Sequence, residues 1–166
     1  MASNGNGGLL HLAGELFKMM TGVNLVHVPY RGAQPALTDL ISGQVQVMFV
    51  ASTLEYIKTG EVRALAVSTA TRSEVLPDIP ALSEFVPDYD AAAWIGVGAP
   101  RNTPREIIDK LNKEINAALA DPKLQLRLAD LGSSVVGGSA ADYGRRLGEE
   151  AEKWAKVIRA ANIKAE

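Results

Sequence analysis

The feature that most constrains the fold is the regular alternation of helix and strand patterns between Leu9 and Thr69. Apolar residues three and four apart indicate helices, and short alternating or continuous apolar runs indicate strands. The predicted helices cover 9–22, 35–43 and 52–60, and the predicted strands cover 25–30, 44–50 and 62–69. This order predicts an α/β fold, a three-layer lobe in which helices cover a mostly parallel sheet. The apolar run 62–69 suits a strand buried on both faces.

After Thr69 the pattern changes. Residues 76–90 predict loops with one short helix starting near Asp78 or Pro80, and residues 91–100 predict a further strand. Helices then dominate, over 102–122, 123–132 and 139–163, with a brief strand at 133–138 between the last two. Thr103 and Glu106 have the spacing of a capping box, and Pro104 suits the first position of that helix.

Composition narrows the class of protein. The 166 residues are 47% hydrophobic and 22% charged, as in a soluble globular domain. A net charge of −2 gives no electrostatic reason to bind nucleic acid. Cysteine is absent, which excludes disulfides and thiolate sites within the sequence. The polar start, "MASNGNGG", is expected to be flexible and lacks the pattern of a signal peptide.

One helix start lacks the usual capping residue. In "YRGAQPAL" the predicted helix begins near Gln34 or Pro35 after Gly32 and Ala33, without a Ser, Thr, Asp or Asn side chain to accept from its first amides. Such amides and the positive end of the helix dipole suit an anion, although water covers them at many turns. Arg31 is placed either to pair with a carboxylate or to face solvent.

The residues that carry a family resemblance are 11–49, 63–85, 99–119 and 154–163. These segments closely resemble the Bug family, the extracytoplasmic solute-binding proteins of tripartite tricarboxylate transporters. The resemblance implies part of a two-lobed, type II periplasmic binding protein that holds a small carboxylate and delivers it to membrane subunits of a transporter. It implies a periplasmic protein, whereas the lack of a signal peptide leaves the cytoplasm open.

The resemblance also predicts how the chain is divided. Residues 1–93 correspond to the second lobe, and residues 94–166 correspond to a hinge strand and a helical segment that returns to the first lobe. A carboxylate is expected against loop amides and helix starts, with no metal or cofactor. The expected ligand-binding residues are Tyr30, Arg31, Gly32, Ala33, Gln34, Ala36, Gly7, Gly8 and Ser52.

Two departures from the family favour an alternative. Asn4, Gly8 and Leu9 stand where relatives have hydroxyl donors near a helix start, and Val50 stands where they commonly have Asp. These changes favour a truncated or recombined relic that no longer binds ligand and acts as a self-associating domain. The apolar face of the helix at 102–122, left without its usual cover, favours a homodimer.

Catalytic signatures do not appear in the sequence. No Ser-His-Asp elbow, HExxH motif or P-loop is present, which argues against an enzyme. His11 and His27 lie on a predicted helix and a predicted strand without an acidic partner close in sequence, so both are expected to be structural rather than metal ligands. Trp94 and Trp154 are expected to be core or interface aromatics.

Overall fold

The computed structural model describes residues 1–50, 53–131 and 133–164. The chain divides into two compact units, one formed by Met1–Ala93 together with Lys153–Glu166 and the other by Trp94–Glu152. The first boundary lies where the sequence analysis divides the chain, but the end of the last helix belongs to the first unit.

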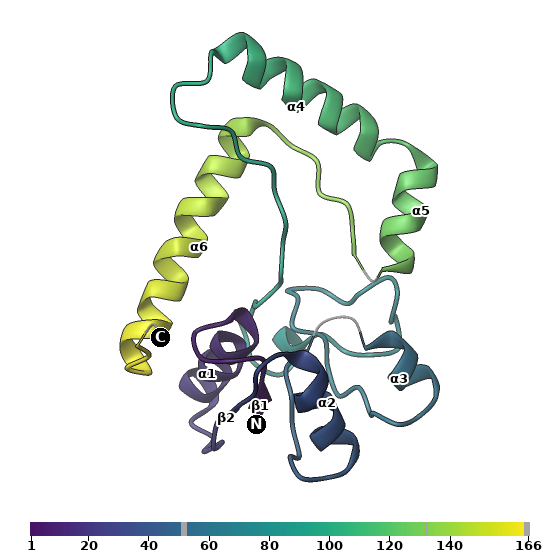
Figure 1. Ribbon diagram of the computed structural model, residues 1–166, viewed down its shortest axis with the longest axis vertical. Helices are drawn as coiled ribbons and strands as arrows, with labels where there is room; N and C mark the ends of the chain where they lie inside the picture. Colours follow the sequence, from purple (N-terminus) through teal and green to yellow (C-terminus); the bar gives the residue numbers. More distant parts are fainter. Residues whose placement is uncertain (51–52, 132, 165–166) are drawn as a thin grey trace. The chain divides into compact units, whose positions relative to one another are not determined.

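The first unit is built on a parallel pair of short strands, β1 (Ala2–Ser3) and β2 (Val28–Pro29) (Figure 1). Ala2 lies opposite Val28, and Ser3 lies opposite Pro29. The amide of Tyr30 donates to the Ser3 carbonyl across 3.0 Å, which extends the pairing by one residue. The α/β class with parallel pairing is therefore confirmed.

The N-terminal segment is an inner strand, so the prediction of a flexible start was wrong. On the side of β1 away from β2, the Ala2 amide donates to the Val47 carbonyl across 2.8 Å, and Ala2 forms a parallel bridge with Met48. Ala2 and Ser3 are fully buried. Two residues are too few for a strand pattern in sequence, and their neighbours on both sides satisfy their backbone groups.

Helices follow both strands of the pair. β1 leads to α1 (Leu9–Thr21), β2 leads to α2 (Ala33–Ile41), and α3 (Leu54–Lys58) comes later (Figure 1). The helices predicted at 9–22 and 35–43 are confirmed within two residues. The helix predicted at 52–60 is shorter than expected, and the one expected near Pro80 is a 3₁₀ turn, η1 (Leu82–Glu84).

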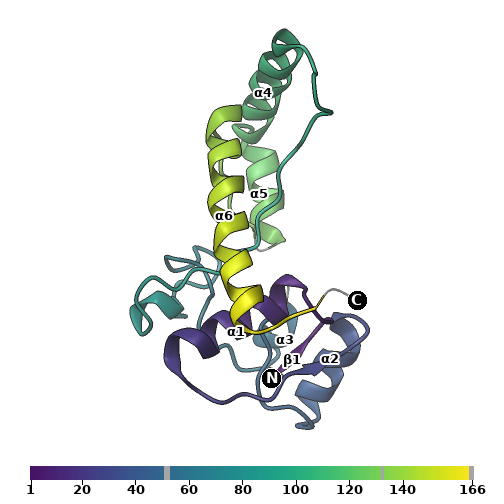
Figure 2. The ribbon, with the colours of Figure 1, turned by 90° about the vertical axis from the view of Figure 1, so that its left-hand side faces the viewer.

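The main core of the first unit lies on α1. Leu12, Ala13 and Leu16 pack with Tyr89 and with Val157, which comes from the end of α6 (Ala140–Ala160) (Figure 2). The Tyr89 side chain is fully buried, and its hydroxyl donates to the Ala13 carbonyl across 2.9 Å. Burial raises the pKa of Tyr89.

The strands predicted at 62–69 and 91–100 form no ladder with a neighbouring strand among the described residues. Within residues 62–69, a parallel bridge joins Val67 to Ala81, but Leu65 is 66% exposed, so the prediction of a strand buried on both faces was wrong. Residues 91–100 form no strand, and Ile95 and Val97 are exposed. A strand forms only where a neighbour pairs with its backbone, and the described residues supply no such neighbour for 92–99.

The second unit contains α4 (Arg105–Leu119), α5 (Pro122–Asp130) and the first part of α6. The side chains of Asn112 and Asn116 donate to the Gly138 carbonyl before α6. Trp94 packs edge-on against Tyr143 with ring centroids 5.6 Å apart. Among the helices of the described residues, none is long and apolar enough to cross a lipid bilayer.

The predicted capping box at α4 is wrong. The Thr103 hydroxyl donates to the Pro100 carbonyl across 2.8 Å, and α4 begins at Arg105 without a side-chain cap from a described residue. Reciprocal capping occurs instead at α6, where the Asp142 amide donates to Ser139 Oγ and the Ser139 amide donates to the Asp142 carboxylate. The sequence spacing therefore predicted the helix α4 correctly, but it did not predict that Ser139, and not Thr103, caps a helix.

We expect Tyr89→Phe to destabilise the first unit by about 0.5–1.5 kcal/mol, the usual contribution of one hydrogen bond, because the Ala13 carbonyl loses its donor. Urea unfolding followed by circular dichroism measures the change. Tyr56→Phe is the matched control, since its hydroxyl makes no hydrogen bond within the described residues, and it should leave stability within about 0.5 kcal/mol. Equal effects of the two changes would contradict the role of Tyr89.

We expect Gly32→Ala to destabilise the chain by about 1–3 kcal/mol through backbone strain. Gly32 has φ 112° and ψ 172°, a conformation that side chains disfavour, and an added Cβ would meet nothing within 4 Å. Gly144→Ala, inside α6 and also without a close contact, should stabilise by up to about 1 kcal/mol. A neutral Gly32→Ala would show that the loop relaxes to a conformation open to all residues.

Candidate functional site

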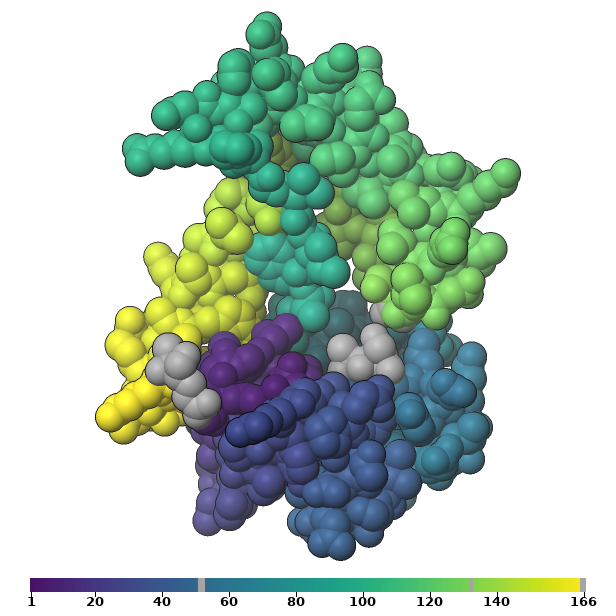
Figure 3. All heavy atoms as spheres, viewed as in Figure 1, coloured from purple at the N-terminus to yellow at the C-terminus, as the bar shows by residue number. Residues whose placement is uncertain are grey.

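Two loops lie side by side at one edge of the parallel pair. Residues 4–8 connect β1 to α1, and residues 30–32 connect β2 to α2. A Cβ built on Gly5 would lie 3.7 Å from the Tyr30 carbonyl oxygen. The purple N-terminal segment and the neighbouring blue segment of α2 also adjoin on the face seen in Figure 3. The carboxyl ends of parallel strands are where open α/β sheets bind ligands.

Both loops end in a helix start that is preceded by glycine. Gly8 precedes α1 and Gly32 precedes α2, and neither start has a side-chain cap from the described residues. In contrast, the Asp121 carboxylate accepts from the Lys123 amide at the start of α5. The first amides of a helix have no partner within it and carry the positive end of its dipole. The edge therefore presents two uncapped helix starts with the polarity that suits an anion.

At α2 the donors are fewer than the sequence predicted. The helix begins at Ala33, one or two residues earlier than expected, so Pro35 falls in the first turn, where it has no amide hydrogen. Ala36 is fully buried in a core cluster with Ala2 and Val45. The donors toward solvent are therefore the amides of Gly32, Ala33 and Gln34, and the Ala33 and Gln34 side chains are exposed.

The two side chains before Gly32 differ in their partners. The Tyr30 hydroxyl donates to Asp39 Oδ2 across 2.7 Å, and this hydrogen bond raises the pKa of Tyr30. Arg31 is exposed and makes no ion pair with any described residue. Arg31 is therefore the cation that the α2 loop offers to a negatively charged group.

The first loop is arranged differently. The Gly7 amide donates to Nδ1 of His11 across 3.0 Å, so an imidazole already accepts from this predicted ligand-binding residue. Gly8 forms the start of α1, and its carbonyl accepts from the Leu12 amide. Ser52, the last predicted site residue, lies outside the described residues.

A stacked pair of histidines beside the loop was missed by the sequence analysis. The rings of His11 and His27 lie 3.7 Å apart at 7°. Nε2 of His27 lies 2.6 Å from Ser3 Oγ, and Nε2 of His11 lies 3.5 Å from a Glu15 oxygen. The expectation that His11 has no nearby acid was wrong, and the i, i+4 spacing to Glu15 on one helix was the available signal.

Burial has a clear effect on both rings. Desolvation is the largest cause that lowers the pKa of His11, opposed by the Glu15 carboxylate. Desolvation, followed by the neighbouring His11, lowers the pKa of His27 to about 4. Both imidazoles are therefore neutral at pH 7.

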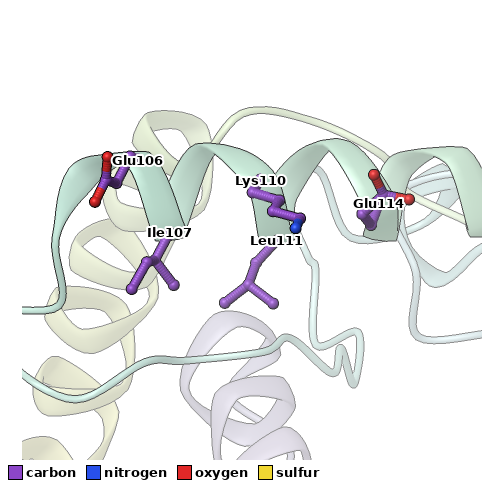
Figure 4. A pocket seen from close by; sticks show the side chains of 5 residues that line it. All are labelled: Glu106, Ile107, Lys110, Leu111 and Glu114. Carbon is purple, nitrogen blue, oxygen red and sulfur yellow. The ribbon is translucent and has the colours of Figure 1, made fainter.

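Other features of the described residues do not make a better site. No group of three His, Asp or Glu side chains within these residues could hold a metal ion. A depression in the second unit is lined by five side chains of α4, and Figure 4 shows Ile107 and Leu111 pointing to the same side of that helix. Its charged residues are Glu106, Lys110 and Glu114, so an excess of carboxylates there disfavours an anionic ligand.

Curated relatives resemble almost the whole chain. It is 39% identical over 161 residues to a UPF0065 protein of Pseudomonas sp. (strain P51), covering 95% of this chain and 48% of that one. It is 37% identical over 158 residues to a UPF0065 protein of Pseudomonas knackmussii, covering 93% of this chain and 94% of that one. The chain thus spans about half the length of the first relative and nearly all of the second.

Solved structures also resemble almost the whole chain, and each is matched over about half of its own length. An R. palustris protein solved with adipate is 39% identical with a TM-score of 0.82, covering 98% of this chain and 55% of that one. The periplasmic binding protein BugD is 34% identical with a TM-score of 0.78, covering 99% and 57%. MatC from Rhodopseudomonas palustris with bound malate is 31% identical with a TM-score of 0.76, covering 95% and 55%.

The family model that matches residues 1–163 is described as the tripartite tricarboxylate transporter family receptor. This match covers nearly the whole sequence, and it agrees with the resemblance of residues 11–49, 63–85, 99–119 and 154–163 to the Bug proteins. The chain therefore belongs to the TctC/Bug family of tripartite tricarboxylate transporter receptors.

Proposed function

We propose that this chain supplies one lobe of a solute-binding protein for a small carboxylate. The observation that carries the proposal is the edge at which β1 and β2 each lead to an uncapped helix start preceded by glycine. Backbone amides and a helix dipole stabilise an anion without a buried cation. One carboxylate oxygen would accept from the amides of Ala33 and Gln34, with Arg31 adding a second, charge-assisted contact.

The ligand class rests on the relatives. Two structures that resemble this chain hold adipate and malate, both of which are dicarboxylates. We propose a dicarboxylate for this chain too, with one carboxylate at the α2 start. Gly8 and Leu9 provide no hydroxyl at the α1 start, so that loop would contribute backbone amides and Asn4 rather than hydroxyl donors.

Family membership supports a proposal for the cellular location and the partners of this chain. Its members are periplasmic solute-binding receptors, which supports a periplasmic role in ligand delivery and not an enzymatic one. Membrane subunits of a tripartite transporter would be the partners that receive the ligand. Because most relatives are about twice as long, the second half of the binding cleft would come from a first lobe outside this sequence.

The alternative is a self-associating domain that no longer binds ligand. By the family resemblance, Val50 stands at a position where Asp is common, and this change would remove an acceptor from the binding cleft. Large apolar side chains of the second unit are exposed, among them Ile107, Leu111 and Leu126 at 46%, 45% and 67%. Burying one such side chain contributes about 1.5–3 kcal/mol, which would support association between two copies.

Calorimetry with adipate, malate and a tricarboxylate tests the proposed ligand class. We expect Ala33→Asp to weaken binding of any dicarboxylate about tenfold or more, because a fixed carboxylate at the first helical position competes for the same amides. The same change should keep or raise stability by about 0.3–1 kcal/mol, since a negative charge at a helix start is favourable.

Ala33→Asn is the matched control, because it has the same size without the charge, and it should bind more tightly than Ala33→Asp. Weaker binding together with unchanged stability separates loss of the site from loss of the fold. If no dicarboxylate or tricarboxylate binds at millimolar concentration, the proposed binding function is wrong, and the self-associating domain remains as the alternative.

Light scattering across a dilution series tests self-association. We expect a dimer at micromolar concentration, and Leu111→Lys should shift the mass to that of a monomer, because a charge on the apolar face of α4 opposes its burial. Lys113→Ala, on the same helix, is the control and should leave the mass unchanged. A monomeric mass for the wild-type chain throughout the series would exclude the homodimer.

A further inference from the structure

We propose that His11 and His27 are positioning residues, which hold the loop of residues 4–8 in its binding geometry while neutral and release it when protonated. The inference rests on the proposed role of that loop in carboxylate binding. It adds a pair of residues that are not placed against the ligand and that make the loop sensitive to pH.

The contacts that carry this inference reach both ends of the loop. At its beginning, Ser3 Oγ donates to the Gly5 carbonyl across 3.0 Å and lies 2.6 Å from Nε2 of His27. At its end, the Gly7 amide donates to Nδ1 of His11 across 3.0 Å. Since the two rings stack at 3.7 Å, they form one connection between the start of the loop and the start of α1.

The hydrogen bond from the Gly7 amide fixes the tautomer of His11. Nδ1 of His11 accepts from Gly7, so its proton lies on Nε2, which faces the Glu15 carboxylate at 3.5 Å. Ser3 Oγ accepts from the Gly5 amide across 3.3 Å and also lies 2.6 Å from Nε2 of His27, so this ring is connected to the loop through Ser3. His11 is therefore bonded to the loop in one neutral form, and His27 contacts the loop through Ser3.

His11 occupies a special place in α1. It is the third residue of the helix, where Glu or Gln often accepts from a backbone amide just before the helix in a capping box. Here a neutral imidazole nitrogen takes that role and accepts from Gly7. A carboxylate would accept at any pH above its own pKa, whereas an imidazole loses its acceptor when it is protonated.

A proton on the pair would break the contact to Gly7. The described groups that influence the rings electrostatically are Glu15, Lys18 and the Met1 amino group. Glu15 favours a proton on His11, and Lys18 opposes it, whereas His27 is further disfavoured by its stacked neighbour. The first proton therefore goes to His11, where Nδ1 becomes a donor facing the Gly7 donor.

The direction of the pH effect follows from linkage. Burial lowers the pKa of both rings below the ordinary value of 6.5, to about 4 for His27. Between these pH values the histidines of the released loop bind protons, and those of the loop held in its binding geometry do not. The binding geometry therefore loses stability as the pH falls through this range. Well above pH 6.5 both rings are neutral in either state, and the loop should be insensitive to pH.

Amide exchange and chemical shifts of Gly5 and Gly7, followed by NMR from pH 7.5 to 4, test the proposal without any ligand. In the wild-type chain we expect protection of the Gly7 amide, corrected for intrinsic exchange, to fall by up to about tenfold per pH unit as the pH drops below 6.5 toward the lowered pKa of His11, the slope for one linked proton. The variant His11→Gln, His27→Gln retains an acceptor at the third helical position and cannot titrate, so its protection should stay constant.

The same loss of protection in the double variant would overturn the proposal, because carboxylates would then cause it. Should the double variant not fold, His11→Gln by itself serves, since it restores the acceptor for Gly7 at all pH values. Loss of Gly7 protection in His11→Gln over the wild-type pH range would equally contradict the role of His11.

Adipate binding at pH 7 and pH 5 links the loop to function. Adipate itself gains protons in this range, so the informative quantity is the ratio of wild-type to double-variant affinity at each pH. We expect this ratio to fall between pH 7 and pH 5. A ratio that does not change while Gly7 loses protection would show that the loop does not contribute to binding. If neither protein binds adipate, the proposed function fails, and the NMR result still decides the positioning role.

Discussion

The first unit depends on the backbone pairing of β1. Ala2 and Ser3 lie between β2 on one side and the segment around Met48 on the other, and both residues are fully buried. Ala36 and Val45 pack against Ala2, so α2 is fixed to the same strand. Without this strand, the loops that begin the two helices would have no common edge.

The parallel arrangement of the two strands then determines where the candidate binding site lies. Because β1 and β2 run in the same direction, both of their following loops meet at one edge, and both helix dipoles present their positive ends there. The loops come into register through the hydrogen bond from the Tyr30 amide to the Ser3 carbonyl. The Tyr30 side chain is in turn fixed by Asp39 of α2. Strand pairing, and not a cluster of charged side chains, therefore creates the candidate site.

Sequence periodicity predicted most of the helices and the α/β class, because amphipathic spacing over three or more turns is a strong local signal. It was less successful for strands, whose formation depends on distant partners. β2 lies within the predicted strand 25–30, but Ala2 and Ser3 have no pattern of their own and still have two neighbours, whereas Leu65 lies in a good pattern and remains exposed. The uncapped start of α2 was predictable because Gly32 and Ala33 have no side-chain oxygen, whereas the presence of Thr103 before α4 did not ensure a cap. The stacked histidines were not, since 16 positions separate them along the chain (27 − 11) and only the fold brings their rings together.

The two helix starts of the site are not equivalent, because their backbone amides differ in how available they are to an anion. At α1 the amide of Gly7 already donates to His11, a neutral acceptor within the chain. At α2 the glycine cap leaves the first amides without any such side-chain acceptor from the described residues, and Arg31 stands beside them. An anion reaching this edge therefore meets its strongest attraction at α2, where no internal bond must first be broken. At the α1 loop the Gly7 amide could reach a ligand only by giving up His11, so this loop would contribute through the geometry that the Gly7–His11 hydrogen bond gives its remaining amides.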